Sequence, residues 1–139
     1  MERTLILVKP DATRRNLGGA ILQRLEAAGL KLVALKMLHV DEPLAHKHYA
    51  VHAGKGFYKD LIEYITSYPI IAAVFEAENA VDLARKTMGA TDPKKAEAGT
   101  IRKDFGLDIQ QNSVHGSDSR ENAAVEIALY FSPREIFAR

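Results

Sequence analysis

The chain has 139 residues, of which 47% are hydrophobic, and this composition predicts a single globular domain with a substantial core and excludes a disordered chain. Its 19 basic and 18 acidic residues leave a net charge of +1, so bulk charge gives no reason to expect nucleic acid or an anionic membrane as the main partner. Because cysteine is absent, disulfides, thiolate metal sites and thiol nucleophiles are excluded.

Apolar runs and helical stripes alternate along the chain. In chain order they predict a strand at 4–8, a helix at 17–28, a strand at 31–40, a helix at 58–65, a strand at 70–75, a helix at 79–88, a long loop, a short strand, a last long helix at 118–131 and a short one at 132–135. Lys9 lies at the end of the first strand, which Pro10 stops. This order suggests an α+β fold, a ferredoxin-like split βαβ sandwich whose four-stranded antiparallel sheet is covered by helices.

Particular residues are expected to begin, end and orient these helices. Gly29 and Gly89 are placed to close two of them, and Asn79 can cap the start of the helix before Gly89. Asp118 with Glu121 makes a capping-box pattern for the last long helix. One face of that helix is expected to carry Ala124, Ile127, Ala128 and Phe131.

The stretch between Gly89 and Val114 has no sustained periodicity. So long a loop inside a compact domain is usually functional, and this one contains Thr91, Arg102 and Asn112. Taken alone, its charged residues would be solvated side chains. Because the loop leads directly to His115, we expect it to form part of a site.

His115 is flanked by small and polar residues in the segment 112–119, at the entrance to the last helix. The backbone N–H groups of Gly116 and Ser117 and the positive end of the helix would favour a phosphate beside the ring. Imidazole is largely neutral at pH 7, so it can attack phosphorus without a separate base. The alternative is a histidine that only occupies a turn, and the other residues of the chain decide between the two.

Four blocks of sequence carry a resemblance to a known family: Lys9-Pro10-Asp11, residues 88–91, residues 99–105, and Asn112 followed by His115-Gly116-Ser117-Asp118-Ser119. In order and spacing they resemble the nucleoside diphosphate kinase family, and the match covers essentially the whole chain. The resemblance implies one nucleoside diphosphate kinase domain over residues 1–139. It also implies ping-pong transfer of the γ-phosphate, mainly from ATP, to a nucleoside diphosphate through a pros-phosphohistidine on His115.

The same resemblance implies roles for the residues around the histidine. Glu126 matches the carboxylate that holds the far ring nitrogen, Ser117 matches a hydroxyl of that network, and Tyr49 lies beside the reacting ring. Without the histidine, Glu126 would be an ordinary solvent-facing carboxylate, and Tyr49 could equally be half-buried core.

Nucleotide binding is assigned through the resemblance as well. The residues that match the family's nucleotide contacts are Lys9, Arg85, Thr91 and Arg102 for the phosphates, Lys9 and Asn112 for the ribose, and Phe57, Leu61 and Ile109 around the base. Stacking accepts every base, so broad nucleotide specificity is expected. The expected cofactor is Mg²⁺, carried on the phosphates with no direct protein ligand, and Asp118 is a candidate contact through water. Arg85 could alternatively be a charge on a helix surface.

Three positions depart from the family pattern. Gly56 replaces the usual proline before the stacking aromatic, which would loosen the loop that holds Phe57. Tyr68 replaces a glycine before Pro69, so a left-handed backbone there is not expected. Ala12 replaces a frequent glycine after Lys-Pro-Asp. None of the three handles phosphate.

Other interpretations of the sequence stay open. His46, His48 and His52 could place two imidazoles on one helix face as metal ligands, although no third ligand is evident. A nucleic-acid-binding module would use Arg14, Arg15, Lys94, Lys95 and Lys103, but the near-zero net charge argues against it as the primary task. A further alternative is a catalytically silent oligomerisation or regulatory domain. Such a domain would not need a histidine, a lysine and two arginines at the spacing of the family's catalytic residues.

The sequence and the family resemblance also lead to expectations for the location and assembly of the protein. The first residues lack the apolar stretch of a signal peptide and no apolar run approaches membrane-spanning length, so we expect a cytoplasmic protein with no membrane partner. The family resemblance implies a homo-oligomer, either a tetramer or a hexamer, acting on nucleoside diphosphates and triphosphates.

Overall fold

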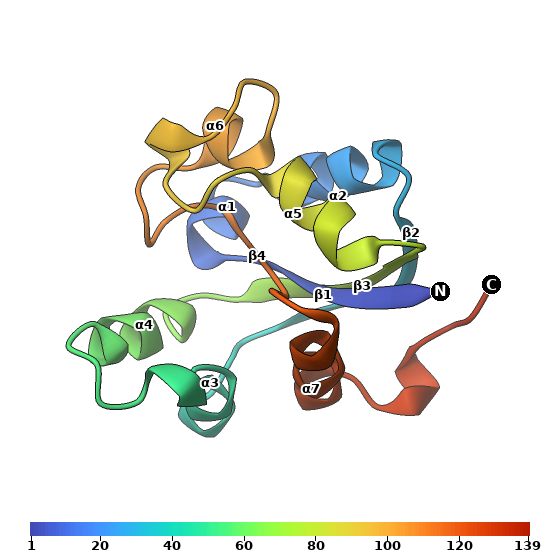
Figure 1. Ribbon diagram of the computed structural model, residues 1–139. Helices are drawn as coiled ribbons and strands as arrows, with labels where there is room; N and C mark the ends of the chain where they lie inside the picture. Colours follow the sequence, from blue (N-terminus) through green and yellow to red (C-terminus); the bar gives the residue numbers. More distant parts are fainter.

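A four-stranded antiparallel sheet forms the centre of the molecule in the computed structural model, which describes residues 1–139 (Figure 1). Its strands are β1 (Glu2–Val8), β2 (Lys31–Leu38), β3 (Ile70–Ala77) and β4 (Val114–Gly116), in the spatial order β2-β3-β1-β4. The predicted α+β fold and the three long strands are confirmed, with ends that differ by at most a few residues. Because β1 is central and covered on both faces, its sequence is a continuous apolar run.

Helices cover both faces of the sheet (Figure 1). They are α1 (Pro10–Arg14), α2 (Gly18–Ala27), α3 (Glu42–His48), α4 (Tyr58–Ile65), α5 (Ala80–Met88), α6 (Ile101–Phe105) and α7 (Arg120–Tyr130), with single 3₁₀ turns at Ala50–His52, Pro93–Lys95 and Pro133–Glu135. One face packs against α2, α5 and α6, and the other against α3, α4 and α7. None of these helices combines the length and the apolar character that crossing a bilayer requires.

Two separate cores result from the alternation of side chains along the strands. Ile6 and Val8 of β1 point to the core under α2 and α5, whereas Leu5 and Leu7 point to the core under α3 and α7. All four side chains are fully buried. The two cores hold β1 rigidly, and β1 in turn positions β4, which pairs with its C-terminal half.

Several expectations for the helix ends were wrong. The N-cap of α7 is Ser119, whose Oγ accepts from the Asn122 amide at 3.0 Å, while Asp118 accepts from the Asn122 side chain. Asn79 occupies the N-cap position of α5 without a capping bond, because the Glu2 carboxylate accepts from the Val81 amide at 2.9 Å.

The buried face of α7 agrees with the expectation only in part: Phe131 is buried and Ile127 packs against the core, as expected. Ala123 and Tyr130 are buried and Glu126 is half-buried, whereas Ala124 and Ala128 are exposed. A carboxylate on the inward face breaks the apolar periodicity, so the pattern was wrong for Ala124 and Ala128. The predicted closures by Gly29 and Gly89 are confirmed, since both have positive φ at helix ends.

The loop between Gly89 and Val114 is more regular than predicted. It contains the 3₁₀ turn at 93–95 and helix α6, which Thr100 caps by accepting from the Lys103 amide at 3.3 Å. Ile101 of α6 is fully buried in the core beside α5. Five residues with one deeply buried side chain are too few to show helical periodicity in a sequence.

Candidate active site

The short strand β4 presents His115 to solvent while burying its two neighbours. Val114 and Gly116 face the core beside α5, and a Cβ on Gly116 would lie only 2.5 Å from the Met88 side chain. Alternation along the strand therefore turns the His115 ring to the opposite side, toward α3 and α7. The chain enters β4 through Ser113, which has a φ of 77°, in the left-handed region.

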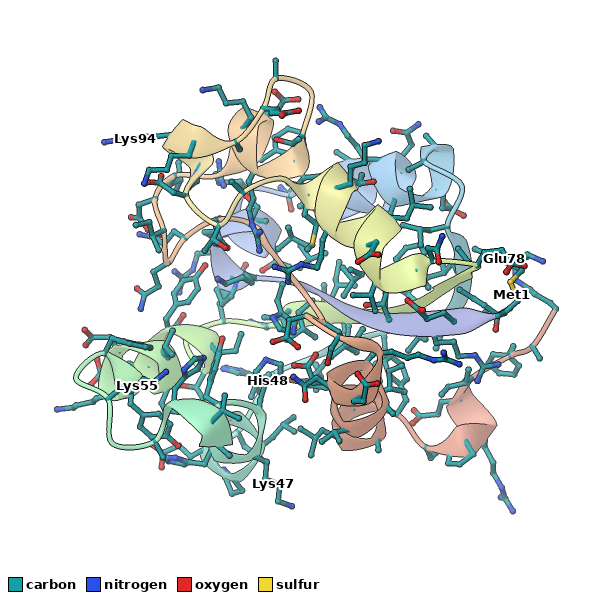
Figure 2. All side chains as sticks on the ribbon, viewed as in Figure 1. Met1, Lys47, His48, Lys55, Glu78 and Lys94 are labelled. Carbon is teal, nitrogen blue, oxygen red and sulfur yellow. The ribbon has the colours of Figure 1, made fainter.

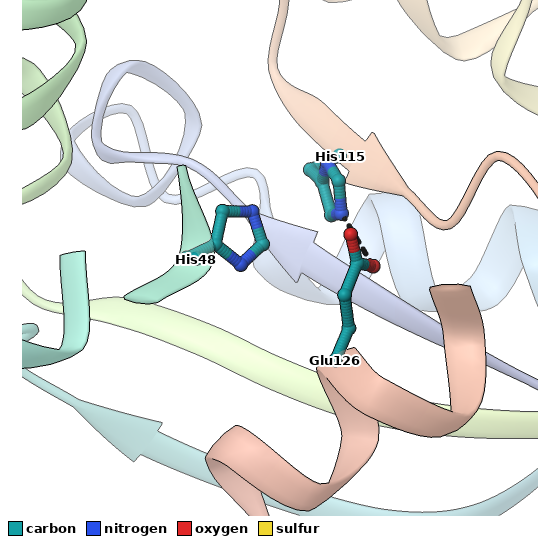
Figure 3. Close-up of side chains that lie close together, drawn as sticks. All are labelled: His48, His115 and Glu126. Atoms are coloured by element: carbon teal, nitrogen blue, oxygen red, sulfur yellow. Dashed lines mark hydrogen bonds and ion pairs between the residues drawn. The ribbon is translucent and has the colours of Figure 1, made fainter. Parts of the chain in front are cut away.

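A carboxylate on α7 fixes the orientation of the His115 ring. Nε2 of His115 lies 3.0 Å from Oε1 of Glu126 (Figure 3), and the side chains are 24% and 17% exposed. The same carboxylate oxygen accepts a hydrogen bond of 2.8 Å from Oγ of Ser117, which itself accepts from the Leu5 amide. Nδ1 has no hydrogen-bond partner in the chain. With Nε2–H donating to the carboxylate, Nδ1 keeps its lone pair.

Glu126 is ionised despite its position. Burial alone would raise its pKa, but the hydrogen bond and charge of His115 and the hydrogen bond from Ser117 outweigh that cost, and the net pKa is lowered. A carboxylate in this state can balance positive charge that develops on the imidazole when Nδ1 forms a bond.

His48 lies directly against the reacting ring, and it was not among the predicted catalytic residues. The two imidazole centroids are 4.7 Å apart in an edge-to-face arrangement, and Nδ1 of His48 lies 3.2 Å from the Tyr130 hydroxyl. Burial lowers the pKa of His48 to about 3, with a further contribution from His115, so this ring is neutral at pH 7.

The signal for His48 was its spacing on α3. Ala45 and His48 are three residues apart and are both buried, so they share the inward face of the helix. The metal pairing of His48 with His46 or His52 was only an alternative, and it is not formed: His46 contacts the Tyr58 hydroxyl and His52 contacts Lys55. His52 lines the same cleft as His48 but lies beside Phe57, whereas His48 lies against the His115 ring.

A cleft of about 640 Å³ opens in front of His115. Among the residues that line it are Lys9, Tyr49, Phe57, Leu61, Arg85, Thr91, Arg102, Ile109, Asn112, His115, Asp118 and Glu126. Every nucleotide-binding residue expected from the sequence is therefore brought to one place. They come from the residue after β1, from α4 and the residue before it, from α5 and α6, and from the loops after α5 and before β4. Ser117 lies behind the cleft and reaches it through Glu126.

Fixed positive charge lines the cleft. Nζ of Lys9 donates to the Gln110 carbonyl at 2.7 Å and to Oδ1 of Asn112 at 3.0 Å. Burial, partly offset by Asp11, lowers the pKa of Lys9 to about 8. Arg102 donates to the carbonyls of Gly89 and Val114, each at 2.9 Å, and its buried Nε has no partner.

Arg102 and Asn112 also hold the walls of the cleft together. Arg102 joins the end of α5 to β4, and Asn112 donates to the carbonyls of Thr91 and Ile109 at 3.0 and 2.9 Å. Burial and the charge of Arg85 lower the pKa of Arg102 to about 10, which still leaves the guanidinium charged at pH 7. Arg85 lies on the cleft rim, so it is not simply a helix-surface charge.

The mouth of the cleft is apolar and aromatic. Phe57 and Ile109 are both largely exposed there, although each is hydrophobic. The rings of Phe57 and His52 are 5.4 Å apart, and Lys55 lies over the outer face of Phe57. An exposed ring and an exposed aliphatic side chain at one mouth can enclose a flat heterocycle between them.

One predicted anion contact is not available. The amide of Ser117 donates to the Leu5 carbonyl at 3.2 Å as a continuation of the β1–β4 pairing. The helix α7 begins only at Arg120, so its N-terminus is farther along the chain than the sequence suggested. Lys9, Arg85 and Arg102 provide the side-chain positive charge of this cleft. Tyr68 has no positive φ, as expected.

Comparison with known proteins gives a consistent result. The family model described as nucleoside diphosphate kinase matches residues 2–136. The chain is 62% identical to a nucleoside diphosphate kinase of Dehalococcoides mccartyi, covering 98% of this chain and 96% of the relative. It is 54% identical to one from Thermomicrobium roseum, covering 98% and 91%.

Solved structures of similar proteins have the same fold. The Aquifex aeolicus nucleoside diphosphate kinase superposes with a TM-score of 0.94 at 41% identity, covering 97% of this chain and 98% of that one. A nucleoside diphosphate kinase from Halobacterium salinarum, solved in complex with CDP, gives 0.96 at 46% identity, covering 99% and 92%.

Proposed function

The chain belongs to the nucleoside diphosphate kinase family and has that activity, and from this premise we propose that His115 carries the phosphate between the two nucleotides. The observation that carries this proposal is the pairing of Nε2 with Glu126 at 3.0 Å, which leaves Nδ1 free beside a cationic cleft. A nucleophile held in one orientation by protein groups needs little reorganisation to react.

In the proposed first half-reaction, the γ-phosphate passes from the nucleoside triphosphate to His115. The Nδ1 lone pair of His115 attacks the γ-phosphorus, the bond from that phosphorus to its bridging oxygen breaks, and the nucleoside diphosphate leaves with the electron pair. The proton on Nε2 stays in its hydrogen bond, and Glu126 balances the charge on the ring. A second nucleoside diphosphate reverses these bonds and takes the phosphate.

We assign the phosphates to the cationic part of the cleft. Lys9, Arg85 and Arg102 supply charge, and Thr91 supplies a hydroxyl. Each charge-assisted hydrogen bond contributes about 1.5 to 3 kcal/mol when the charge is fully engaged. Lys9 and Asn112 take the ribose, and Tyr49 lies beside the reacting ring, with its pKa raised to about 12 by burial. Tyr49 is therefore neutral, and its hydroxyl can donate or accept a hydrogen bond.

The base is proposed to stack on Phe57, with Ile109 opposite and Leu61 beside it. Nothing in this part of the cleft is restricted to one base, so we expect broad nucleotide specificity, with ATP the main donor. The CDP bound by the Halobacterium salinarum relative supports a nucleotide in a cleft of this kind.

We propose Mg²⁺ as the cofactor, bound to the phosphates of the substrate. The cleft fits such an ion poorly as a direct ligand cage, because its phosphate end carries Lys9, Arg85 and Arg102, which are cations. Asp118 is a carboxylate of the lining that could reach the ion through water. When bound, the ion neutralises part of the phosphate charge.

We also propose a homo-oligomer of single-domain chains in the cytoplasm. The edge strand β2 exposes Leu35 and Met37, which are 50% and 64% exposed, side by side on one face. An unpaired edge with exposed apolar residues favours association with a second copy. The lack of cysteine suits a reducing compartment.

Transfer of label tests the proposal about His115. Incubation with γ-labelled ATP alone should label the protein in an acid-labile, base-stable form, and addition of another nucleoside diphosphate should remove the label. His115→Ala should take up none. Label that stays on the His115→Ala variant at the wild-type level would overturn the assignment.

A further inference from the structure

Three metal-ligating side chains meet beside the cleft, and the proposed phosphoryl transfer uses only two of them. His48 from α3, His115 from β4 and Glu126 from α7 point toward one another (Figure 3), and one ligand atom from each lies within 4.8 Å of the other two. All three line the cleft, so an ion could enter from solvent. They come from three separate elements, and their juxtaposition depends on the fold.

The spacing is close to that of a metal coordination sphere. Ligand atoms around a tetrahedral Zn²⁺ lie about 3.3 to 3.5 Å apart, given bonds of about 2.0 to 2.2 Å. Nε2 of His115 and Oε1 of Glu126 are already 3.0 Å apart. The nitrogen of His48 lies within 4.8 Å of both atoms, so it would have to approach them to complete a coordination sphere.

Outer hydrogen bonds of the kind that support metal ligands are in place. The Tyr130 hydroxyl lies 3.2 Å from Nδ1 of His48 and can accept a hydrogen bond from the Nδ1–H group, which would leave Nε2 of that ring free as a ligand. Oγ of Ser117 donates to Glu126 and orients the carboxylate. Two of the three ligands are therefore already held by neighbouring groups.

We propose that His48, His115 and Glu126 form a Zn²⁺ site whose occupation inhibits the enzyme. Two imidazoles and one carboxylate, with a fourth position open to the cleft, are a ligand set that Zn²⁺ prefers and Mg²⁺ does not. An ion bound to the His115 ring withdraws electron density from it and replaces its hydrogen bond to Glu126. The inhibitory part of this inference depends on the proposed function of His115, whereas the binding part does not.

Binding is tested on untagged protein in the absence of nucleotide, after treatment with a chelator and its removal. Calorimetric titration with ZnCl₂ should show one ion per chain, and titration with MgCl₂ should show none at this site. His48→Phe, which keeps a buried ring, and Glu126→Gln should each weaken Zn²⁺ binding by at least about tenfold. His46→Ala, which removes an exposed histidine of the same helix, is the matched control and should bind as the wild type does.

Two results would overturn the site: wild-type protein that binds no Zn²⁺, or binding that His48→Phe and Glu126→Gln retain while His46→Ala loses it. Should His48→Phe not fold, Glu126→Gln alone carries the comparison with the control. One equivalent of Zn²⁺ should also block labelling by γ-labelled ATP, and a chelator should restore it. Labelling that proceeds with the site filled would overturn the inhibitory role.

The two proposals fail in different ways. If label enters His115 but Zn²⁺ does not bind, the metal site is wrong and the nucleophile stands. If Zn²⁺ binds to these three residues but no label enters the protein, the metal site stands and the assignment of the nucleophile is wrong.

Discussion

At the residue scale, the protonation of one imidazole decides the chemistry. Glu126 receives hydrogen bonds on the same oxygen from His115 and Ser117, so a single carboxylate sets both the orientation of the ring and its tautomer. Lys9 and Arg102, which we propose bind the phosphates, hydrogen-bond to groups other than the His115 ring. In the proposed mechanism, different residues therefore orient the nucleophile and bind the nucleotide.

Replacing Glu126 with glutamine removes the negative charge of the side chain and keeps its size. The amide oxygen can still accept from Nε2, but it cannot balance a positive ring, so we expect kcat to fall by about 10- to 100-fold, as for loss of a charge-assisted bond. Steady-state kinetics with the fold checked by circular dichroism would measure this. Glu121→Gln, an exposed change on the same helix, should leave kcat unchanged, and wild-type turnover in Glu126→Gln would contradict the role given to the carboxylate.

His48 should make the stability of the protein depend on pH. Burial and the neighbouring charge of His115 lower its pKa to about 3, against the attraction of Glu126, while Tyr49 and Tyr130 beside it are uncharged at neutral pH. The unfolded chain therefore binds the proton below about pH 6.5 and the folded chain does not, so stability is complete above that pH and is lost as the pH falls.

The free energy of unfolding, measured with urea and a chelator present, should thus decrease between pH 6.5 and 4.5 by up to about 1.4 kcal/mol per unit. His48→Phe should flatten this dependence, and His46→Phe should keep it. A slope that is the same in both variants would show that His48 is not the responsible group.

Sequence patterns could place the nucleophile and its cleft but not His48. The motif around His115, together with Lys9, Arg102 and Asn112, identified residues that do line one cleft, because the family resemblance fixes their order and spacing. His48 has His52 four residues away, and the sequence offered this pairing only as a less favoured alternative. Its actual neighbours, His115 and Tyr130, are 67 and 82 positions distant, and only the fold brings them together.

At the element scale, the start of α7 matters because this helix carries Glu126. Ser119→Ala removes the side chain that accepts from the Asn122 amide and should lower the free energy of unfolding by about 1 kcal/mol. Asp118→Ala removes only an exposed bond to the Asn122 side chain and should cost less than half as much. Denaturation in urea would compare the two, and a larger loss in Asp118→Ala would restore Asp118 as the cap.

Elements with many buried apolar residues could be predicted, and short or polar ones could not. Strands β1 and β3 are nearly continuous apolar runs, and the stripe on α4 was identified at its correct bounds. Helix α6 has five residues, and α7 places a carboxylate inward, so the apolar pattern is either too short or interrupted. In both helices a charged side chain, Arg102 in α6 and Glu126 in α7, occupies an inward position where an apolar residue would have completed the pattern.

At the scale of the whole molecule, the exposed apolar residues of β2 predict association of chains. Leu35→Glu combined with Met37→Glu should reduce the mass measured by light scattering from a multiple of the chain mass toward that of one chain. Leu107→Glu changes an exposed apolar residue away from β2 and should leave the mass unchanged. An unchanged mass in the double variant would place the contact elsewhere.

The most direct test of the account is the position of the phosphate on the imidazole ring. Phosphorylated protein, prepared with ATP and labelled with ¹⁵N in its histidines, can be examined by NMR through the coupling of phosphorus to the ring nitrogens. Because Nε2 of His115 is held by Glu126 and Nδ1 is free, the account predicts phosphate on Nδ1 of His115 alone. Phosphate on Nε2 of that ring, or on any other residue in place of His115, would contradict it.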